Sequence, residues 1–569
     1  MPSLHRHPLT RLVAASLTAL GLAASFSVGA CSLVIDGEID SCTTPEDCVN
    51  LAGTTCEAGR CVSVDKCQSN ADCSDETQIC RRVSPRTCVP VLGAGCQEIY
   101  PEDVAVWRDD STILVGVTSP MTEEGAPSDT GVSISNASKL AVKEINAAGG
   151  VTGGETSRRL ALVICDDQGS TEVALQNGDH LVAAGIQSTI GPAYSGMTKA
   201  FSEQKAIPAG MLTISTSATS PDLTGVSDTD PTCVSACAGS SSCVAACPPL
   251  LWRTSPSDLL QGDAIVKYFP ELELFAKGRV DPPVPTLKVQ ILHKSDAYGE
   301  GLRDAIVNNL EFNGQKATQQ TANFKTAGYG NPDDGDPIDQ AAVQATIDFL
   351  PDVVILIGTN EVGPILTTIE AGYDTAGQAP LKPYYVFADG GLVSAVANAA
   401  RDAGARTRVR GTIPGSASAV FEKFRFEYDQ EFPTGSDDAS VFGSAGAYDS
   451  VYMLAYAART TTTPRPSGAD LARGLAKMVG GATRIEPGRT QFGTGMQTIG
   501  SGAAIDFDGA SGPLDFDLET GEAPSDIQIW CLPSGPDVGG NAPQGSFSGR
   551  YYEAASQTMK GSAASFCTE

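Results

Sequence analysis

The sequence predicts an α/β protein with two Rossmann-like lobes, built on parallel sheets and preceded by a small disulfide-rich segment. From about residue 112, short apolar runs alternate with amphipathic helical stretches, a pattern typical of parallel sheets covered by helices. This region extends to about residue 535 and is too long for one hydrophobic core, so two lobes are expected. Ten of the 17 cysteines precede residue 97, where apolar residues are few. Disulfides are therefore expected to replace a core there.

The apolar runs predict the strands one by one. Residues 113–117 are apolar throughout, as in a strand buried on both faces. The apolar residues from Ile134 to Ile145 recur at helical spacing, so a helix is expected next. A second helix is predicted at 170–184, and further strands at 160–164, 188–190, 209–214, 287–292, 353–357 and 384–387.

The N-terminus predicts export and a lipid anchor. Two arginines precede an apolar stretch at 12–28, the pattern of a signal peptide. Residues 28–31 resemble a bacterial lipobox, so residues 1–30 are predicted to be a lipoprotein signal peptide and Cys31 the lipidation site. The alternative is ordinary secretory cleavage, which leaves Cys31 as a structural thiol.

The predicted location is the cell envelope of a Gram-negative bacterium. The protein is expected at the periplasmic face of the outer membrane or in the periplasm, with the cell surface as a further location. No later stretch reaches 18 apolar residues, so the rest of the chain is expected to be soluble.

The cysteines predict a stapled segment and an insertion. Residues 31–97 are interpreted as a stalk that contains two approximate repeats of four cysteines, and residues 226–249 as an insertion with nested bridges 233–247 and 237–243. Each stalk repeat allows three connectivities, and zinc is the less favoured alternative because the compartment is oxidising. Cys165 is interpreted as a buried free thiol, and Cys96 as a partner of Cys531 or Cys567. The disulfide candidates are Cys42, Cys48, Cys56, Cys61, Cys67, Cys73, Cys80, Cys88, Cys233, Cys237, Cys243 and Cys247.

Polar side chains follow four of the predicted strands. In open α/β sheets, ligands bind beyond the carboxyl ends of strands. Hydroxyl groups in the loops at 191–196 and 215–221 suit a carboxylate, and Asp389 suits an ammonium group. Tyr194 and Tyr298 suit an apolar wall. For each serine or threonine alone, helix capping is the simpler interpretation; the coincidence at four strand ends favours a binding site.

Six motifs occur in order along this region. They are EINAAGGV (144–151), DDQGS (166–170), IGPAYSG (190–196), ISTSATSPDLT (214–224), WRTSPSDLLQG (252–262) and YGEGL (298–302). Together they resemble the leucine/isoleucine/valine-type periplasmic binding proteins, which have the type I solute-binding fold.

The resemblance implies two lobes joined by a three-strand hinge, with crossovers near Arg253, near Pro414 and near residue 520. The first lobe would comprise residues 112–253 and 415–520, and the second 254–414 and 521–535. Residues 536–569 would form a C-terminal extension.

The resemblance also implies roles for individual residues. Ser195, Ser217 and Thr219 would hold the carboxylate and ammonium of an amino acid, Tyr298 would close on the ligand, and Asp389 would pair with the ammonium. Two positions depart from the family, since Thr130 and Thr359 stand where an aromatic side chain is common. Asp389 is also one methylene shorter than the usual glutamate. These departures suggest a ligand larger or more polar than leucine, with Tyr194 and Thr359 in its wall.

The predicted function is that of a lipid-anchored solute-binding protein. It would capture an amino acid or related small molecule for an ABC permease; the alternative is a receptor that signals to a membrane sensor through the same cleft, and a third is a ligand-free scaffold. No nucleophilic triad or G-x-S-x-G motif accompanies His180 or His293, so the protein is not expected to be an enzyme.

The composition excludes several partners. Acidic residues outnumber basic ones 67 to 38, which argues against a nucleic-acid partner. The acidic turns at 333–336 and 506–509 lack the full calcium-loop pattern, so neither a metal nor a cofactor is expected. The arginines at 401, 406, 408 and 410 are interpreted as a solvated face.

Overall fold

The computed structural model describes residues 42–48, 53–123, 125–152, 157–238, 240–244, 246–415, 418–433, 439–537, 540 and 542–562. The predicted signal peptide, Cys31 and Cys567 lie outside the described residues. The chain divides between Val64 and Asp65 into two compact units, and each is described by itself. No helix among the described residues is long and apolar enough to span a membrane.

The first unit contains the first cysteine repeat. A short 3-10 helix, η1 (Pro45–Cys48), precedes a hairpin of β1 (Thr54–Glu57) and β2 (Arg60–Ser63). Disulfides join Cys42 to Cys56 and Cys48 to Cys61. The apolar side chains are too few to form a core, so these bridges hold the unit together.

The second repeat has the same connectivity but packs on the main body. Its elements are η2 (Asn70–Asp72), β3 (Gln78–Cys80) and β4 (Cys88–Pro90), with disulfides 67–80 and 73–88. The Asn70 amide donates to the carbonyl of Arg108 at 2.9 Å, and the Arg108 guanidinium donates to the carbonyls of Asn70 and Cys73. Counted from its first cysteine, the first repeat has Pro45 in place of Asn70 and cannot make these bonds. The second repeat is therefore part of the main body, unlike the spacer that the sequence suggested.

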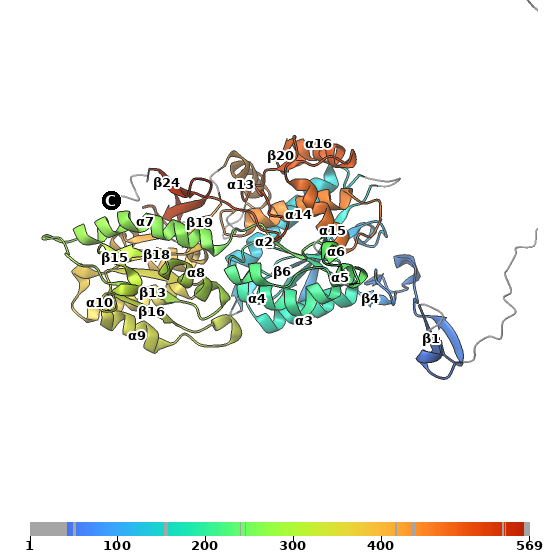
Figure 1. The fold of residues 1–569 in the computed structure, drawn as a ribbon, viewed down its shortest axis with the longest axis horizontal. Coiled ribbons are helices and arrows are strands. Elements are labelled where there is room, and N and C mark those ends of the chain that lie inside the picture. Colours follow the sequence, from blue (N-terminus) through green and yellow to red (C-terminus); the bar gives the residue numbers. More distant parts are fainter. Residues whose placement is uncertain are drawn as a thin grey trace, which may run out of the picture. The chain divides into compact units, whose positions relative to one another are not determined.

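The first lobe is built on a six-stranded sheet in the order β12-β11-β10-β6-β9-β5. All neighbours are parallel except β5 with β9. In β6, alternate residues point to opposite faces: Val115 packs under α2 and α14, and Leu114 packs against α3 and α4 (Figure 1). The strands are β5 (Cys96–Tyr100), β6 (Ile113–Ser119), β9 (Leu160–Asp166), β10 (Ser188–Ile190), β11 (Leu212–Ser215) and β12 (Leu251–Arg253).

The second lobe is built on an eight-stranded sheet in the order β16-β13-β17-β18-β19-β22-β23-β24. The first five strands are parallel, and the last three add antiparallel neighbours. The predicted C-terminal extension supplies β23 and β24 to this sheet. The strands are β13 (Val289–His293), β16 (Phe324–Gly328), β17 (Val353–Ile357), β18 (Tyr384–Phe387), β19 (Val409–Pro414), β22 (Ile527–Cys531), β23 (Ser546–Glu553) and β24 (Thr558–Gly561).

Helices cover both faces of each sheet, so the predicted α/β fold is confirmed, with antiparallel edge strands added. The helices are α1 (Val104–Trp107), α2 (Asp129–Ala147), α3 (Thr171–Ala184), α4 (Ser195–Phe201), α5 (Pro231–Ala236), α6 (Ser241–Val244), α7 (Asp258–Gly278), α8 (Ala297–Val307), α9 (Gln340–Phe349), α10 (Val362–Thr375), α11 (Ser394–Ala399), α12 (Ala403–Arg406), α13 (Ala419–Glu431), α14 (Ser444–Arg459), α15 (Gly468–Leu475) and α16 (Arg489–Gly500). Short strand pairs are β7 (Thr122–Glu123) with β8 (Ala126–Pro127), β14 (Glu311–Phe312) with β15 (Gln315–Lys316), and β20 (Arg484–Ile485) with β21 (Asp506–Phe507).

The chain passes between the lobes three times. It leaves the first sheet after Arg253, returns after Pro414 and enters the second sheet again at Ile527. Arg253, which is buried, links two of these passages, because its N–H donates to the carbonyl of Gly521 and its guanidinium pairs with Glu522 at 2.6 Å.

Two interpretations of side chains are corrected. Cys165 is not a free thiol but is bonded to Cys96, which joins β5 to β9; Cys531 is in a disulfide but not with Cys96. The arginine run is a solvated face only at Arg401, which is exposed; Arg406 and Arg410 are buried. Arg406 donates to three backbone carbonyls, which satisfies a guanidinium inside the lobe.

In the insertion, disulfides 233–247 and 237–243 form the nested arrangement that the spacing predicts.

Removing the bridge between β5 and β9 should destabilise the first lobe. The closed loop spans 69 residues, so a C96S/C165S double variant is expected to lose about 4 kcal/mol of unfolding free energy by the chain-entropy relation. Urea unfolding followed by tryptophan fluorescence measures this. The matched variant C42S/C56S breaks a bridge in the other compact unit and should leave the main transition in place. An unchanged midpoint for C96S/C165S would show that the bridge adds nothing to the lobe.

Candidate functional site

One cavity lies where loops from the carboxyl ends of strands in both sheets meet. Loops after β10 and β11 contribute from the first lobe, and loops after β13, β17 and β18 from the second. The lining residues are Thr130, Ala193, Tyr194, Ser195, Ser217, Lys294, Asp296, Tyr298, Thr359, Asn360, Asp389, Gly390, Leu392, Val393, Val441 and Phe442. Every predicted site residue is among them except Thr219, which lies behind the wall and is fully buried.

The hydroxyls of the first lobe hold its two loops together. Ser195 is the first residue of α4, and its Oγ accepts the backbone N–H groups of Thr219 and Ser220, each at 3.1 Å. The Ser217 hydroxyl donates to the carbonyl of Ala193 at 3.0 Å. No described residue accepts the proton of the Ser195 hydroxyl, so this donor is left for an acceptor in the cavity.

Asp389 lines the cavity, and a second buried carboxylate, Asp258, lies close enough to repel it. Asp389, 4% exposed, follows β18, and Asp258, fully buried, begins α7 directly after the first crossover. The Thr219 hydroxyl donates to Asp258 Oδ2 at 3.0 Å, while Oδ1 has no hydrogen-bond partner among the described residues. Neither carboxylate forms an ion pair with a described lysine or arginine.

Burial without an ion-pair partner raises the pKa of both carboxyl groups. It raises the pKa of Asp389 to about 6. Burial, followed by repulsion from Asp389, raises the pKa of Asp258 well above its ordinary value. Tyr298, near the start of α8, donates its hydroxyl to Asp389 Oδ1 at 2.7 Å and is itself buried. Asp389 is therefore satisfied by a neutral donor and remains short of positive charge.

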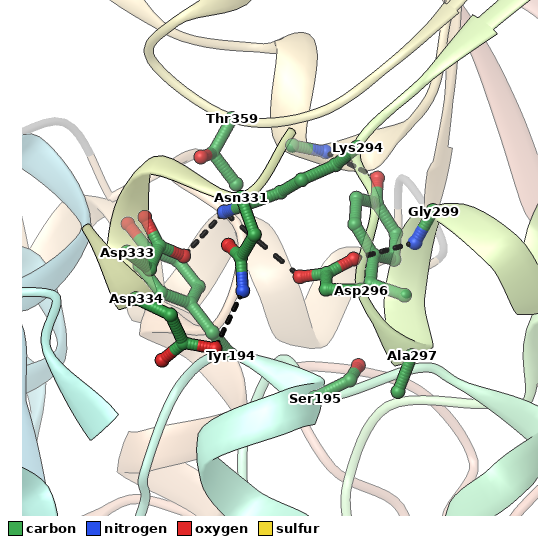
Figure 2. Close-up of polar contacts among 12 residues, drawn as sticks. Tyr194, Ser195, Lys294, Asp296, Ala297, Gly299, Asn331, Asp333, Asp334 and Thr359 are labelled. Carbon is green, nitrogen blue, oxygen red and sulfur yellow. Dashed lines mark hydrogen bonds and ion pairs between the residues drawn. The ribbon is translucent and has the colours of Figure 1, made fainter. Parts of the chain in front are cut away.

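Lys294 lies on another side of the cavity (Figure 2). Its ammonium reaches over the ring of Tyr194, 5.4 Å from the centroid, and lies between Asp333 and Asp296. Burial opposes the charge of Lys294, but Glu361, Asp333 and Asp296 outweigh it, so its pKa is raised. Burial raises the pKa of Asp333 to about 7. This wall is polar, whereas Ala193, Leu392, Val393, Val441 and Phe442 provide the apolar part of the lining.

The two lobes touch directly around the cavity. Glu123 of the first lobe accepts the Tyr194 hydroxyl at 2.8 Å and the amide of Asn360, from the second lobe, at 2.6 Å. Ser394 of the second lobe donates to Asp129 of the first at 2.6 Å. Hydrogen bonds therefore join the two lobes beside the cavity.

Sequence analysis missed Asp258, Lys294 and Asn360. Asp258 has the appearance of an ordinary acidic residue in the first turn of a helix, where it complements the helix dipole. Lys294 and Asn360 follow buried strands at the same edge as Tyr298 and Thr359, and that position was a usable signal.

Comparisons with known proteins agree with this architecture. A model of the periplasmic binding protein family matches residues 112–529. Among curated relatives, the Leu/Ile/Val-binding protein BraC3 of Rhizobium johnstonii is 28% identical over 36% of this chain and 45% of its own length. The Leu/Ile/Val-binding protein of Escherichia coli K12 is 28% identical over 39% of this chain and 49% of its own. The chain thus spans about half the length of the curated relatives it matches.

Solved structures show the same fold. The branched-chain amino acid transporter substrate binding protein LivJ from Streptococcus pneumoniae, in complex with isoleucine, has a TM-score of 0.52 at 21% identity and covers 74% of this chain and 96% of its own. A type 1 periplasmic binding protein from Bordetella pertussis has a TM-score of 0.52 at 17% identity, with 76% and 100% covered. The matched family consists of binding proteins rather than enzymes. With most of its length matched by the family model, this chain belongs to the periplasmic binding protein family.

Proposed function

We propose that this protein captures a small molecule with an amino group, an amino acid or a related compound, in the cleft between its lobes. The observation that carries the proposal is Asp389, a buried carboxylate that lines the cavity, together with Asp258, a second buried carboxylate close enough to repel it. Neither forms an ion pair with a described lysine or arginine, although the guanidinium of Arg253 attracts the charge of Asp258. A buried charge without a partner is costly, and a ligand ammonium would supply the missing charge.

The rest of the cavity fits such a ligand. The free proton of the Ser195 hydroxyl can donate to a carboxylate, and the apolar side chains around Phe442 can cover a carbon skeleton. Curated relatives named for leucine, isoleucine and valine support the amino-acid class. Lys294, Asn360 and the threonines at 130 and 359 favour a larger or more polar side chain than that of leucine.

The route of the ligand is also a proposal. Delivery to an ABC permease follows the relatives, and anchoring follows from lipidation at Cys31, with the protein in the cell envelope, at the periplasmic face of the outer membrane, in the periplasm or at the cell surface. The alternative, signalling to a membrane sensor, is favoured by the first cysteine repeat, which forms a compact unit apart from the binding fold.

Binding should be visible as stabilisation. A ligand at 100 times its dissociation constant adds about 2.7 kcal/mol to the stability, so a thermal-shift screen of amino acids, small peptides and organic acids should reveal ammonium-bearing hits. Calorimetry should then show that D389N loses at least tenfold in affinity for these hits, while D348N, at an exposed carboxyl of the same lobe, does not. A screen without any amine hit would refute the proposal.

The same variant should make the empty protein more stable. The pKa of Asp389 is raised from 3.8 to about 6 in the folded state, so the native carboxylate costs stability as the pH rises above about 4, and the full cost applies above about 6. D389N removes this cost and should gain up to about 3 kcal/mol at pH 8, and much less at pH 4. Denaturant unfolding at both values measures the difference. An equal gain in stability at pH 8 and pH 4 would show that the charge of Asp389 does not destabilise the folded protein.

Lipidation is tested by metabolic labelling. In a bacterial host that processes lipoproteins, incorporation of a radiolabelled fatty acid should be lost in C31A and kept in C42A, which removes a stalk cysteine. Label that persists in C31A would exclude Cys31 as the acylated residue.

A further inference from the structure

A second cavity lies next to the first, beside the strands that join the lobes. Its wall takes Thr254 from the first crossover, Pro414 from the second and Ser511 from the segment before the third. Val441 and Phe442 line both cavities and form the partition between them. In the loop directly after β11, the neighbouring residues Thr216 and Ser217 face different cavities: Thr216 lines the second and Ser217 the first.

Two unpaired hydroxyl groups line this cavity. Thr216 is 2% exposed and Thr254 3%, and neither Oγ1 atom has a hydrogen-bond partner among the described residues. Buried hydroxyls are nearly always bonded, because an unmet group loses its hydration without compensation. The presence of two such hydroxyls in one cavity therefore points to a group that binds there.

The start of α14 faces the same space. Gly443, at φ +95°, precedes this 16-residue helix and gives it no side-chain cap, and Gly443, Ala445 and Gly446 all line the cavity. A Cβ added at Gly443 would lie 3.1 Å from Thr216 Oγ1, and one at Gly446 would collide with Thr254 Oγ1. Both hydroxyls thus lie against the first turn, where backbone N–H groups lack helical partners and the helix dipole is positive.

The charges nearby favour an acceptor of modest size. Among the described residues, no lysine, arginine, aspartate or glutamate lines the cavity. The carboxylate of Asp449 is bound to two residues of the wall: it accepts the N–H groups of Ala510 and Ser511 and the Ser511 hydroxyl, at 2.6–2.9 Å. A wall that offers hydroxyl and N–H donors, and no carboxylate, suits an anion and not a metal cation.

We infer that this second cavity binds a small anionic group, a halide or a carboxylate, through the hydroxyls of Thr216 and Thr254 and the first turn of α14. The group can be a free ion or the far carboxylate of a ligand that extends past Phe442. Since the wall includes residues of two crossovers, an occupied cavity would link the lobe that carries α14 to two of the segments that connect the lobes. The inference does not depend on the amino-acid site, which uses other side chains.

Bromide provides a direct probe. Crystals of the mature protein, grown without amino acids and soaked in sodium bromide, should show an anomalous peak within hydrogen-bond distance of both threonine hydroxyls. A T216V/T254V double variant should lose this peak, and each single variant should weaken bromide binding about tenfold in a ⁸¹Br NMR linewidth titration. The control T189V removes another buried, unpaired hydroxyl that lines neither cavity, and it should bind as the parent does.

The outcomes are separable. A cavity without bromide, or a peak that persists in T216V/T254V, overturns the inference, whatever the amino-acid screen shows. If a valine variant fails to fold, T216S and T254S keep the hydroxyls and must keep bromide. Displacement of bromide by a dicarboxylic amino acid, but not by alanine, identifies the ligand's own carboxylate as the source. Bromide retained with both identifies a free anion.

Discussion

The burial of Asp258 and Asp389 without a paired cation is the constraint on which the site depends. The two carboxylates come from distant parts of the chain, one from the start of α7 after the first crossover and one from the loop after β18. Thr219, from the loop after β11, donates its hydroxyl to Asp258. The acidic pair therefore exists only where both lobes and a crossover meet, and in the proposed function its cost is offset by the positive charge of the ligand.

Much of the fold could be predicted because its signals are local. The run Val353–Ile357 is entirely apolar and forms β17 with the predicted bounds. The strand β19 was missed because it starts within a run of arginines. A local pattern cannot show that the guanidinium of Arg406 is buried, because the carbonyl groups that accept its hydrogen bonds belong to residues 397, 533 and 543. The bridge between Cys96 and Cys165 was also missed because it depends on a distant partner: it forms only because β5 pairs with β9, and the two cysteines are 69 residues apart in the sequence.

The position of the candidate site could be predicted from the residues that follow the strands. Ser195 and Ser217 follow strands of the first sheet, and Tyr298 and Asp389 follow strands of the second, so the topology of each sheet brings its own two residues to one edge. Topology does not predict what each hydroxyl does. Thr219 was expected in the wall, yet its side chain supports Asp258 from behind, and Ser217 binds a carbonyl of the neighbouring loop. Such roles follow from tertiary partners that a sequence pattern does not contain.

The hydrogen bond from Tyr298 to Asp389 affects which ligand the cleft can favour. In this structure the Tyr298 hydroxyl satisfies Asp389, and Gly390 N–H in turn donates to that hydroxyl at 3.3 Å. A neutral donor relieves hydrogen bonding but not charge, so the raised pKa of Asp389 persists. A ligand ammonium would add charge compensation to the hydrogen bond, whereas a neutral ligand could only repeat what Tyr298 already provides. We therefore propose that the acidic pair selects cationic ligands, because only a cation adds charge compensation to the hydrogen bond that Tyr298 already provides.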